Sequence, residues 1–127
     1  MSFQTIARGR YGEDVAAQFL VKSGYRILEK NFKTRLGEID IIAKDGRTIC
    51  FVEVKMRRTK QQGSPLEAVT KKKQLKLSRL ALIYLKNKDM MDQQARFDVV
   101  AVSKNQNGDD ELTLVKDAFE LSGGYSY

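Results

Sequence analysis

The chain has 127 residues, no histidine, one cysteine and a formal net charge of +7. These counts exclude a disulfide framework within the chain, zinc sites built from cysteine and histidine, and any catalytic triad or acid–base pair that needs an imidazole. An enzyme of this composition would have to use carboxylates, lysine, arginine, hydroxyls and a hard metal ion such as Mg²⁺ or Mn²⁺. The length predicts a single domain over residues 1–127, with its core at about residues 5–117 and a mobile tail at residues 123–127.

The sequence also predicts where the protein works. Every apolar run is much shorter than the ~20 residues that span a bilayer, so no membrane contact is expected. Residues 1–10 lack the apolar core of a signal peptide. Together with the single cysteine, Cys50, these features predict a cytoplasmic protein.

The first half of the chain predicts one helix and three strands. A helix is expected over about residues 5–23, because Val15, Ala16, Phe19 and Leu20 are spaced three and four apart. Gly24 is suited to end it. Strands are expected at residues 25–32, 37–43 and 48–56, and the last two are joined by an Asp-Gly pair that is typical of a hairpin turn.

The second half predicts one helix and two strands. The helix has two candidate starts, at Ser64-Pro65 with Glu67 in the capping-box position, or at Thr70, and it runs to about Lys86. Strands are expected at residues 96–102 and 112–115. The predicted order is therefore α-β-β-β-α-β-β, a mixed sheet with helices packed on it at the boundary between the α/β and α+β classes.

Four ionisable residues interrupt the otherwise apolar strands of the predicted hairpin: Glu38, Asp40, Glu53 and Lys55. Charges in such surroundings cost free energy unless they are paired or bind a metal. A two-residue turn at residues 45–46 places Glu38 opposite Glu53, and all four charges on one face of the hairpin. Opposed carboxylates repel unless a cation lies nearby, and a divalent metal or the lysine would relieve that repulsion.

This arrangement has the chemistry of a metal-dependent nuclease. Asp40 and Glu53 would supply oxygen ligands to Mg²⁺, and the Val54 carbonyl could add another. The metal would polarise a phosphate and lower the pKa of a bound water, while Lys55 would hold that water and offset developing charge. The alternative is that Glu53 and Lys55 form a solvated pair on the open face of an edge hairpin.

Glu13 is a candidate from the first helix. It lies on the line of Ala16 and Leu20, at the margin of the apolar stripe, so it could reach a metal site at the edge of the sheet. Alternatively, it only interacts favourably with the amino terminus of its helix.

The residues at these positions resemble a known bacterial family. The similarity covers about residues 8–102 and is carried by Gly12-Glu13, residues 24–28, Asn31, Gly37-Glu38-Ile39-Asp40, residues 51–55, Gly63, Pro65, residues 67–69 and residues 96–100. In these motifs the chain resembles the YraN-like family. That family is assigned to the PD-(D/E)XK, or restriction-endonuclease-like, superfamily, and its layout is similar to that of archaeal Holliday-junction resolvases.

The resemblance implies a role for each matched residue. It implies Asp40 and Glu53 as metal ligands, Lys55 as the catalytic lysine and Glu13 as an accessory acid. Related nucleases often carry a further polar residue on the helix after the Glu-x-Lys strand. The accessory candidates here are Glu38, from the shared face of the hairpin, and Gln74 or Lys73, from that helix.

One segment accounts for the excess of positive charge. Residues 55–79 contain nine basic residues and one acidic residue. Such a local concentration fits a polyanion, and beside the proposed metal site it would neutralise the phosphates of a nucleic acid, expected to be DNA. The alternative is a solvated lysine-rich helix face. The candidate nucleic-acid-binding residues are Arg57, Arg58, Lys60, Lys71, Lys72, Lys73 and Lys76.

These observations lead to a functional hypothesis with two alternatives. The main hypothesis is a Mg²⁺-dependent (or Mn²⁺-dependent) endonuclease that acts on DNA, including branched or structured DNA. The first alternative is a nucleic-acid-binding module with a nuclease-like fold and no catalysis. The second is a protein-interaction domain that presents its basic helix to an acidic partner. A structure-resolving nuclease of this layout would be expected to form a homodimer, because two symmetric cuts need two sites.

Overall fold

The computed structural model describes residues 3–57 and 69–120, with the side chains of the first helix from residue 9 onward. The elements are α1 (Phe3–Lys22), β1 (Arg26–Thr34), β2 (Gly37–Asp45), β3 (Thr48–Met56), α2 (Lys71–Asn87), β4 (Ala95–Lys104) and β5 (Asp110–Phe119). The predicted order α-β-β-β-α-β-β is confirmed. The final strand is longer than the predicted segment 112–115, because β5 pairs along most of its length with β4.

The five strands form one mixed sheet in the order β1-β2-β3-β4-β5. Neighbouring strands are antiparallel except β3 and β4, which are parallel. The α2 helix lies in the connection between those two strands, as the crossover of a parallel pair requires. The fold class predicted from the sequence, a mixed sheet flanked by helices, is confirmed.

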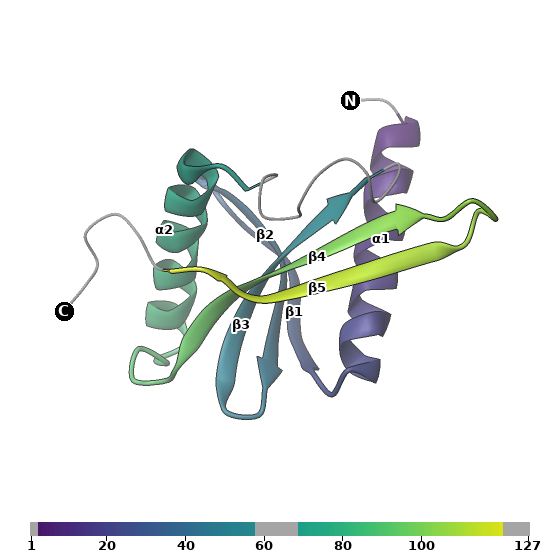
Figure 1. Ribbon diagram of the computed structural model, residues 1–127. Coiled ribbons are helices and arrows are strands. Elements are labelled where there is room, and N and C mark those ends of the chain that lie inside the picture. Colours follow the sequence, from purple (N-terminus) through teal and green to yellow (C-terminus); the bar gives the residue numbers. More distant parts are fainter. Residues whose placement is uncertain (1–2, 58–68, 121–127) are drawn as a thin grey trace.

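The two helices cover opposite faces of the sheet (Figure 1). On one face Ala16 and Leu20 of α1 pack against strand residues that include Ile41, Val52 and Val100. On the other face α2 packs against the opposite side of the same strands, through Leu77, Leu80 and Tyr84 on Ile42, Phe51 and Val99. The period-two alternation of the strands divides the apolar side chains between these two cores.

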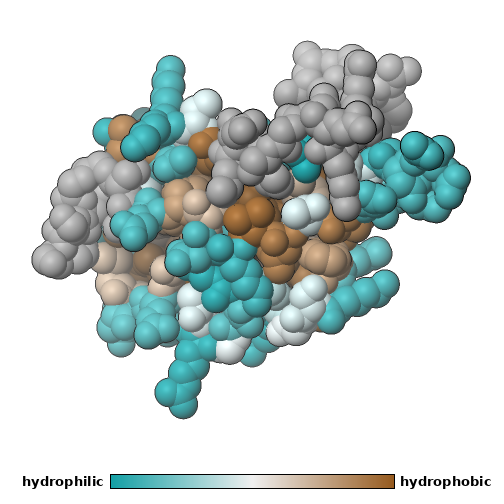
Figure 2. All heavy atoms as spheres, viewed as in Figure 1, coloured by the Kyte–Doolittle hydropathy of each residue, from teal (hydrophilic) through white to brown (hydrophobic). Residues whose placement is uncertain are grey.

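Figure 2 shows that hydrophobic side chains gather near the middle of one face of the molecule, with hydrophilic ones around them. Within the described ranges, no helix is long and apolar enough to cross a membrane.

The start of α2 follows one of the two predicted signals. The helix begins at Lys71, and the Thr70 side chain caps it by accepting a hydrogen bond from the Lys73 amide at 3.2 Å. The other predicted start, at residues 64–67, lies outside the described residues, as does the tail at residues 123–127.

The predicted register of the central hairpin was wrong by two residues. Asp45 pairs with Thr48 and Ile42 pairs with Phe51, so the turn consists of Gly46 and Arg47 rather than Asp45 and Gly46. Gly46 has a φ of +61°, and glycine at the first central position is a feature of type II′ hairpin turns. The predicted opposition of Glu38 and Glu53 is therefore absent. A shift of two keeps the alternation of faces within the paired segment, because the side-chain period of a strand is also two. The alternation changes only beyond Ile41, where the pairing with β3 ends.

Candidate functional site

The site lies where β2 and β3 separate. Their paired residues end at Ile41 and Val52. On β2, Ile41 belongs to the core under α1, whereas Ile39, two residues earlier, belongs to the core under α2. The strict alternation of faces therefore breaks at Asp40. Asn31 of the neighbouring strand β1 has a φ of +57° at the same level, so β1 is distorted there too.

The Asp40 side chain continues the contact between the two strands where their backbones part. Its Oδ2 accepts a hydrogen bond from the Val54 amide at 2.8 Å. This bond holds the carboxylate against β3 and satisfies a backbone donor that has lost its ladder partner. The Asp40 carboxylate is thus oriented by a backbone amide of β3 and not by another side chain.

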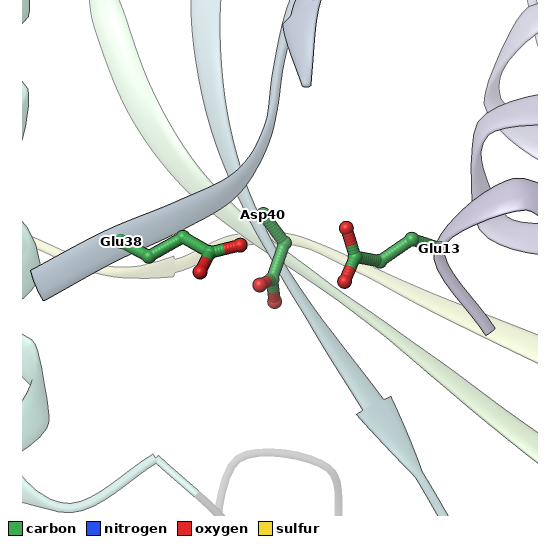
Figure 3. A group of neighbouring side chains, drawn as sticks. All are labelled: Glu13, Glu38 and Asp40. Carbon is green, nitrogen blue, oxygen red and sulfur yellow. The ribbon is translucent and has the colours of Figure 1, made fainter. Parts of the chain in front are cut away.

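Three carboxylates converge at this point. Glu13 from α1 and Glu38 and Asp40 from β2 each offer an oxygen, and the three oxygens all lie within 4.8 Å of one another. Figure 3 shows the three side chains pointing toward one another from the helix and the strand. Gly12 packs against the Met56 side chain, and a Cβ at residue 12 would lie 2.9 Å from Met56 Cγ, so that side chain would have to move.

The cluster is unfavourable for negative charge. The pKa of Asp40 is raised to about 7, chiefly by burial and then by the charge of Glu53, and the Val54 hydrogen bond opposes both effects. Burial and the charge of Glu38 likewise raise the pKa of Glu13, against the lowering effect of Asn31 and Lys30. Convergent, partly buried carboxylates fit a hard divalent cation, because bound charge would relieve both desolvation and repulsion. Glu13, Glu38 and Asp40 are the residues that could hold it.

Glu53 lies beside this cluster, in a pocket of about 280 Å³ between the strands and α2. It is only 6% exposed, and its Oε1 is 2.6 Å from Lys73 Nζ. Burial alone would lower the pKa of Lys73, but the hydrogen bond and charge of Glu53 outweigh it and raise that pKa. The pocket is lined by Gly37, Glu38, Asp40, Glu53, Lys73 and Lys76.

The structure brings most of the predicted catalytic residues together. Asp40 and Glu53 share the pocket, and Glu13 reaches Asp40 from the other side of the sheet. Lys55 is half-buried on β3 and lies close enough to Lys73 to act on its pKa. The assignment of Glu53 as a metal ligand stays a prediction, because in this structure the carboxylate pairs with Lys73.

The predicted nucleic-acid-binding residues are more dispersed. Lys71 and Lys72 are exposed on the first turn of α2, and Lys76 lies at the rim of the acidic pocket. Arg57 follows β3 and lines a second pocket. Gln74, an accessory candidate, is not among the residues that line the acidic pocket, and its side-chain amide donates to the Val69 carbonyl at 3.0 Å. Arg58 and Lys60 lie outside the described residues.

The sequence did not predict the pairing of Glu53 with Lys73 in the candidate site. The sequence of α2 nevertheless contains a pattern that could have predicted this ion pair. Lys73 is one turn before Leu77, which is buried against the sheet together with Tyr84. A lysine at the head of the apolar stripe must face the sheet, where a buried carboxylate can neutralise it.

A second buried charge cluster lies at the opposite end of β2, near the hairpin turn. The Arg96 Nε donates to Asp98 Oδ1 at 3.0 Å. Asp98 is fully buried and also accepts from the Tyr25 hydroxyl at 2.9 Å. Arg96 further donates to Asp45 at 2.6 Å. With every charge partnered, this network joins β2, β4 and the start of β1 and has a structural role.

The fold and the site define an α+β protein whose mixed sheet carries a cluster of carboxylates between its two helices. The model of a family described as "Uncharacterised protein family UPF0102" matches residues 12–102. The chain belongs to this family, which confirms the YraN-like resemblance. All the acidic residues of the cluster fall within the matched segment.

Similar proteins cover almost the whole chain. A UPF0102 protein of Syntrophus aciditrophicus is 51% identical over 121 residues, which cover 95% of this chain and 94% of the relative. A UPF0102 protein of Desulfosudis oleivorans is 51% identical over 114 residues, with 90% of each chain covered. A UPF0102 protein of Clostridium kluyveri is 45% identical over 114 residues, with 89% of this chain and 93% of the relative covered.

Proposed function

We propose that this protein is a Mg²⁺-dependent endonuclease of the PD-(D/E)XK type that hydrolyses phosphodiester bonds in DNA, including branched or structured DNA. The observation that carries the proposal is the Asp40 carboxylate, which the Val54 amide fixes at the point of strand separation among Glu13, Glu38 and Glu53. Carboxylate oxygens arranged in this way are the ligands that Mg²⁺ and Mn²⁺ prefer.

Each side chain has a role in this proposal. Asp40, Glu13 and Glu38, with Glu53 beside them, hold the ion, which when bound would polarise the phosphate and lower the pKa of a water molecule. Lys55 orients the attacking water and offsets charge that develops on the phosphate oxygens. Lys73 neutralises Glu53 and keeps a positive charge at the pocket. Glu13 and Asp40 stay partly shielded from solvent, which strengthens these electrostatic interactions.

The basic residues beside the pocket support a nucleic-acid substrate. Lys71, Lys72 and Lys76 lie on the first two turns of α2, next to the acidic site. Lysine ammonium groups placed there would contact backbone phosphates and so position the substrate without reading its sequence.

Cleavage and metal binding test the proposal together. Incubation of branched, flapped and linear DNA with Mg²⁺ or Mn²⁺ should give products with the wild-type protein. Glu53→Gln should lower the rate by about 10²-fold, because it removes a charge that the ion requires. Glu29→Gln, a matched change on β1 outside the cluster, should leave it unchanged. Unaltered cleavage by the Glu53→Gln protein would show that the site has been assigned wrongly.

The second candidate function is a nucleic-acid-binding module without catalysis, which the exposed lysines of α2 favour. This module would bind DNA equally well in EDTA, and calorimetric titration with Mn²⁺ would show no binding at the carboxylates. An ion that binds the wild-type protein but not the Asp40→Asn variant would favour the enzyme instead.

Both functions predict a contribution from the start of α2. Lys71→Glu combined with Lys72→Glu should weaken DNA binding and lower the magnitude of the slope of log affinity against log salt by about 2, since each lost phosphate contact removes roughly 0.9. The variant should fold, because acidic residues are favourable in the first turn of a helix. The matched control, Lys86→Glu with Lys88→Glu at the other end of α2, should keep most of the affinity. Equal losses in the two variants would indicate a general charge effect, not a binding site.

A further inference from the structure

A second pocket lies next to the carboxylate cluster, on the face of the sheet that α1 covers. It has a volume of about 290 Å³ and lies between α1 and the ends of β3, β4 and the start of β5. These elements come together at the first half of α1 (Figure 1). The lining residues include Tyr11, Met56, Arg57, Val102, Lys104 and Asp110.

Several residues that line this pocket are close in sequence to residues of the proposed active site. Tyr11 precedes Glu13 by two residues on α1, and Arg57 follows Lys55 by two residues on β3. Between them, Gly12 packs directly on Met56, which forms part of the pocket wall. Residues two apart on a helix project from different sides of it, so the pocket and the carboxylates lie on either side of α1 within one turn. A nucleic-acid strand that crosses this turn of α1 would reach both.

The lining has the chemistry of a nucleotide site. Met56 and Val102 provide apolar surface, and Tyr11 provides an aromatic ring that is 44% exposed. Lys104 lies 5.1 Å from the centre of that ring and pairs with the Asp110 carboxylate at 2.6 Å, and Arg57 adds a second cation. Aromatic rings stack on any base, and cations beside them attract the phosphate.

We propose that this pocket binds an unpaired nucleotide adjacent to the phosphodiester bond that is cleaved. The inference rests on the proposed nuclease function and specifies its substrate class. A base in a continuous duplex is stacked on both sides and cannot present its ring to Tyr11, whereas a base in a flap, a fork or a single strand can. The substrate is therefore nucleic acid with a single-stranded segment.

Tyr11 also has a structural contact that the test must separate from stacking. Its hydroxyl donates to the Asp110 carboxylate and accepts a hydrogen bond from Lys104 at 3.3 Å. These bonds join α1 to the ends of β4 and β5. Tyr11→Phe removes them but keeps the ring, while Tyr11→Ala removes both.

The experiment uses a short single-stranded oligonucleotide with a 2-aminopurine base at successive positions, mixed with the full-length protein in EDTA so that nothing is cleaved. Stacking on Tyr11 should quench the fluorescence at one position. Tyr11→Phe should quench and bind like the wild-type protein, and Tyr11→Ala should bind roughly 5- to 150-fold more weakly without quenching. The same oligonucleotide in a full duplex should show no quenching with any of the three proteins.

Equal losses in Tyr11→Phe and Tyr11→Ala would overturn the proposal, because the hydroxyl contacts and not the ring would then be responsible. Equal affinity of the wild-type and Tyr11→Ala proteins for the single strand would also overturn it. The failure of the nuclease function gives a different result: the wild-type protein would quench in EDTA but cleave nothing when Mg²⁺ is added. A nuclease that cuts flaps equally well with Tyr11→Ala would contradict this inference alone.

Discussion

Replacing Asp40 with asparagine should abolish metal-dependent cleavage and, at the same time, stabilise the metal-free protein above neutral pH. The loss of cleavage is expected because the central carboxylate of the cluster becomes a neutral amide. The gain in stability is expected because Asp40 is buried beside Glu53, Glu13 and Glu38, where its negative charge is unfavourable. The asparagine carbonyl can still accept the hydrogen bond from the Val54 amide.

The direction of the pH dependence follows from the raised pKa of Asp40. The pKa is about 7 in the folded protein against an ordinary value of 3.8, so the folded state holds an extra proton between these values. The free energy of unfolding of the wild-type protein should therefore fall as pH rises through this window, and the full loss should be present above it. Since one pKa unit corresponds to about 1.4 kcal/mol, and neighbouring carboxylates can relax, we expect a difference of about 1–3 kcal/mol between variant and wild type at high pH.

Urea denaturation of the two proteins at a series of pH values measures this difference. The stabilities should converge in acid and diverge in base, and Mg²⁺ should stabilise the wild-type protein only. Asp14→Asn is the matched control, because Asp14 is a neighbour of Glu13 on α1 whose exposed carboxylate pairs with Lys30. It should change stability by less than about 1 kcal/mol and leave cleavage intact. A less stable Asp40→Asn protein at high pH would contradict the assignment of Asp40 as a destabilised charge.

Replacing Asp98 with alanine should cause the largest loss of stability in the chain's charge network. Asp98 is fully buried and accepts hydrogen bonds from Arg96, from the Tyr25 hydroxyl and from the Asp117 amide at 2.9 Å. Alanine would leave the buried Tyr25 hydroxyl and the Asp117 amide without this acceptor, and, of the described carboxylates, Arg96 would keep only Asp45 as a partner. A loss of about 3–5 kcal/mol in the free energy of unfolding is expected.

Two variants make this result interpretable. Asp98→Asn keeps an acceptor of the same size and should lose less, while Asp109→Ala, at an exposed position in the β4–β5 turn, should change stability by no more than about 0.5 kcal/mol. Because the network lies at the end of β2 opposite Asp40, the folded fraction of the alanine variant should still bind Mn²⁺ in a calorimetric titration. Loss of metal binding in a protein that remains folded would show that the two ends of the sheet are coupled.

The local elements were predictable because their signals are local. The apolar spacing of Ala16 and Leu20, the Asp-Gly pair in the hairpin and the threonine before Lys71 all act within a few residues. They therefore yielded the order of helices and strands and the placement of Asp40 and Glu53 on one hairpin. The exact register of the hairpin was not predictable, since a shift of two residues preserves the alternation on which the prediction depended.

The mixed fold, the absence of imidazole chemistry and the placement of carboxylates and a lysine on one hairpin follow from the order of the residues alone. Three contacts become visible only in the folded protein: Glu13 completes the cluster around Asp40, Lys73 pairs with Glu53, and Tyr11 lines a second pocket. These contacts join α1 or α2 to strands far away in the chain, and they depend on how closely each helix packs on its face of the sheet. The periodicity of a single element does not specify the distance between a helix and the sheet. In the folded protein that distance depends on contacts between elements, such as that of Gly12 with Met56, and the site also depends on the separation of β2 from β3.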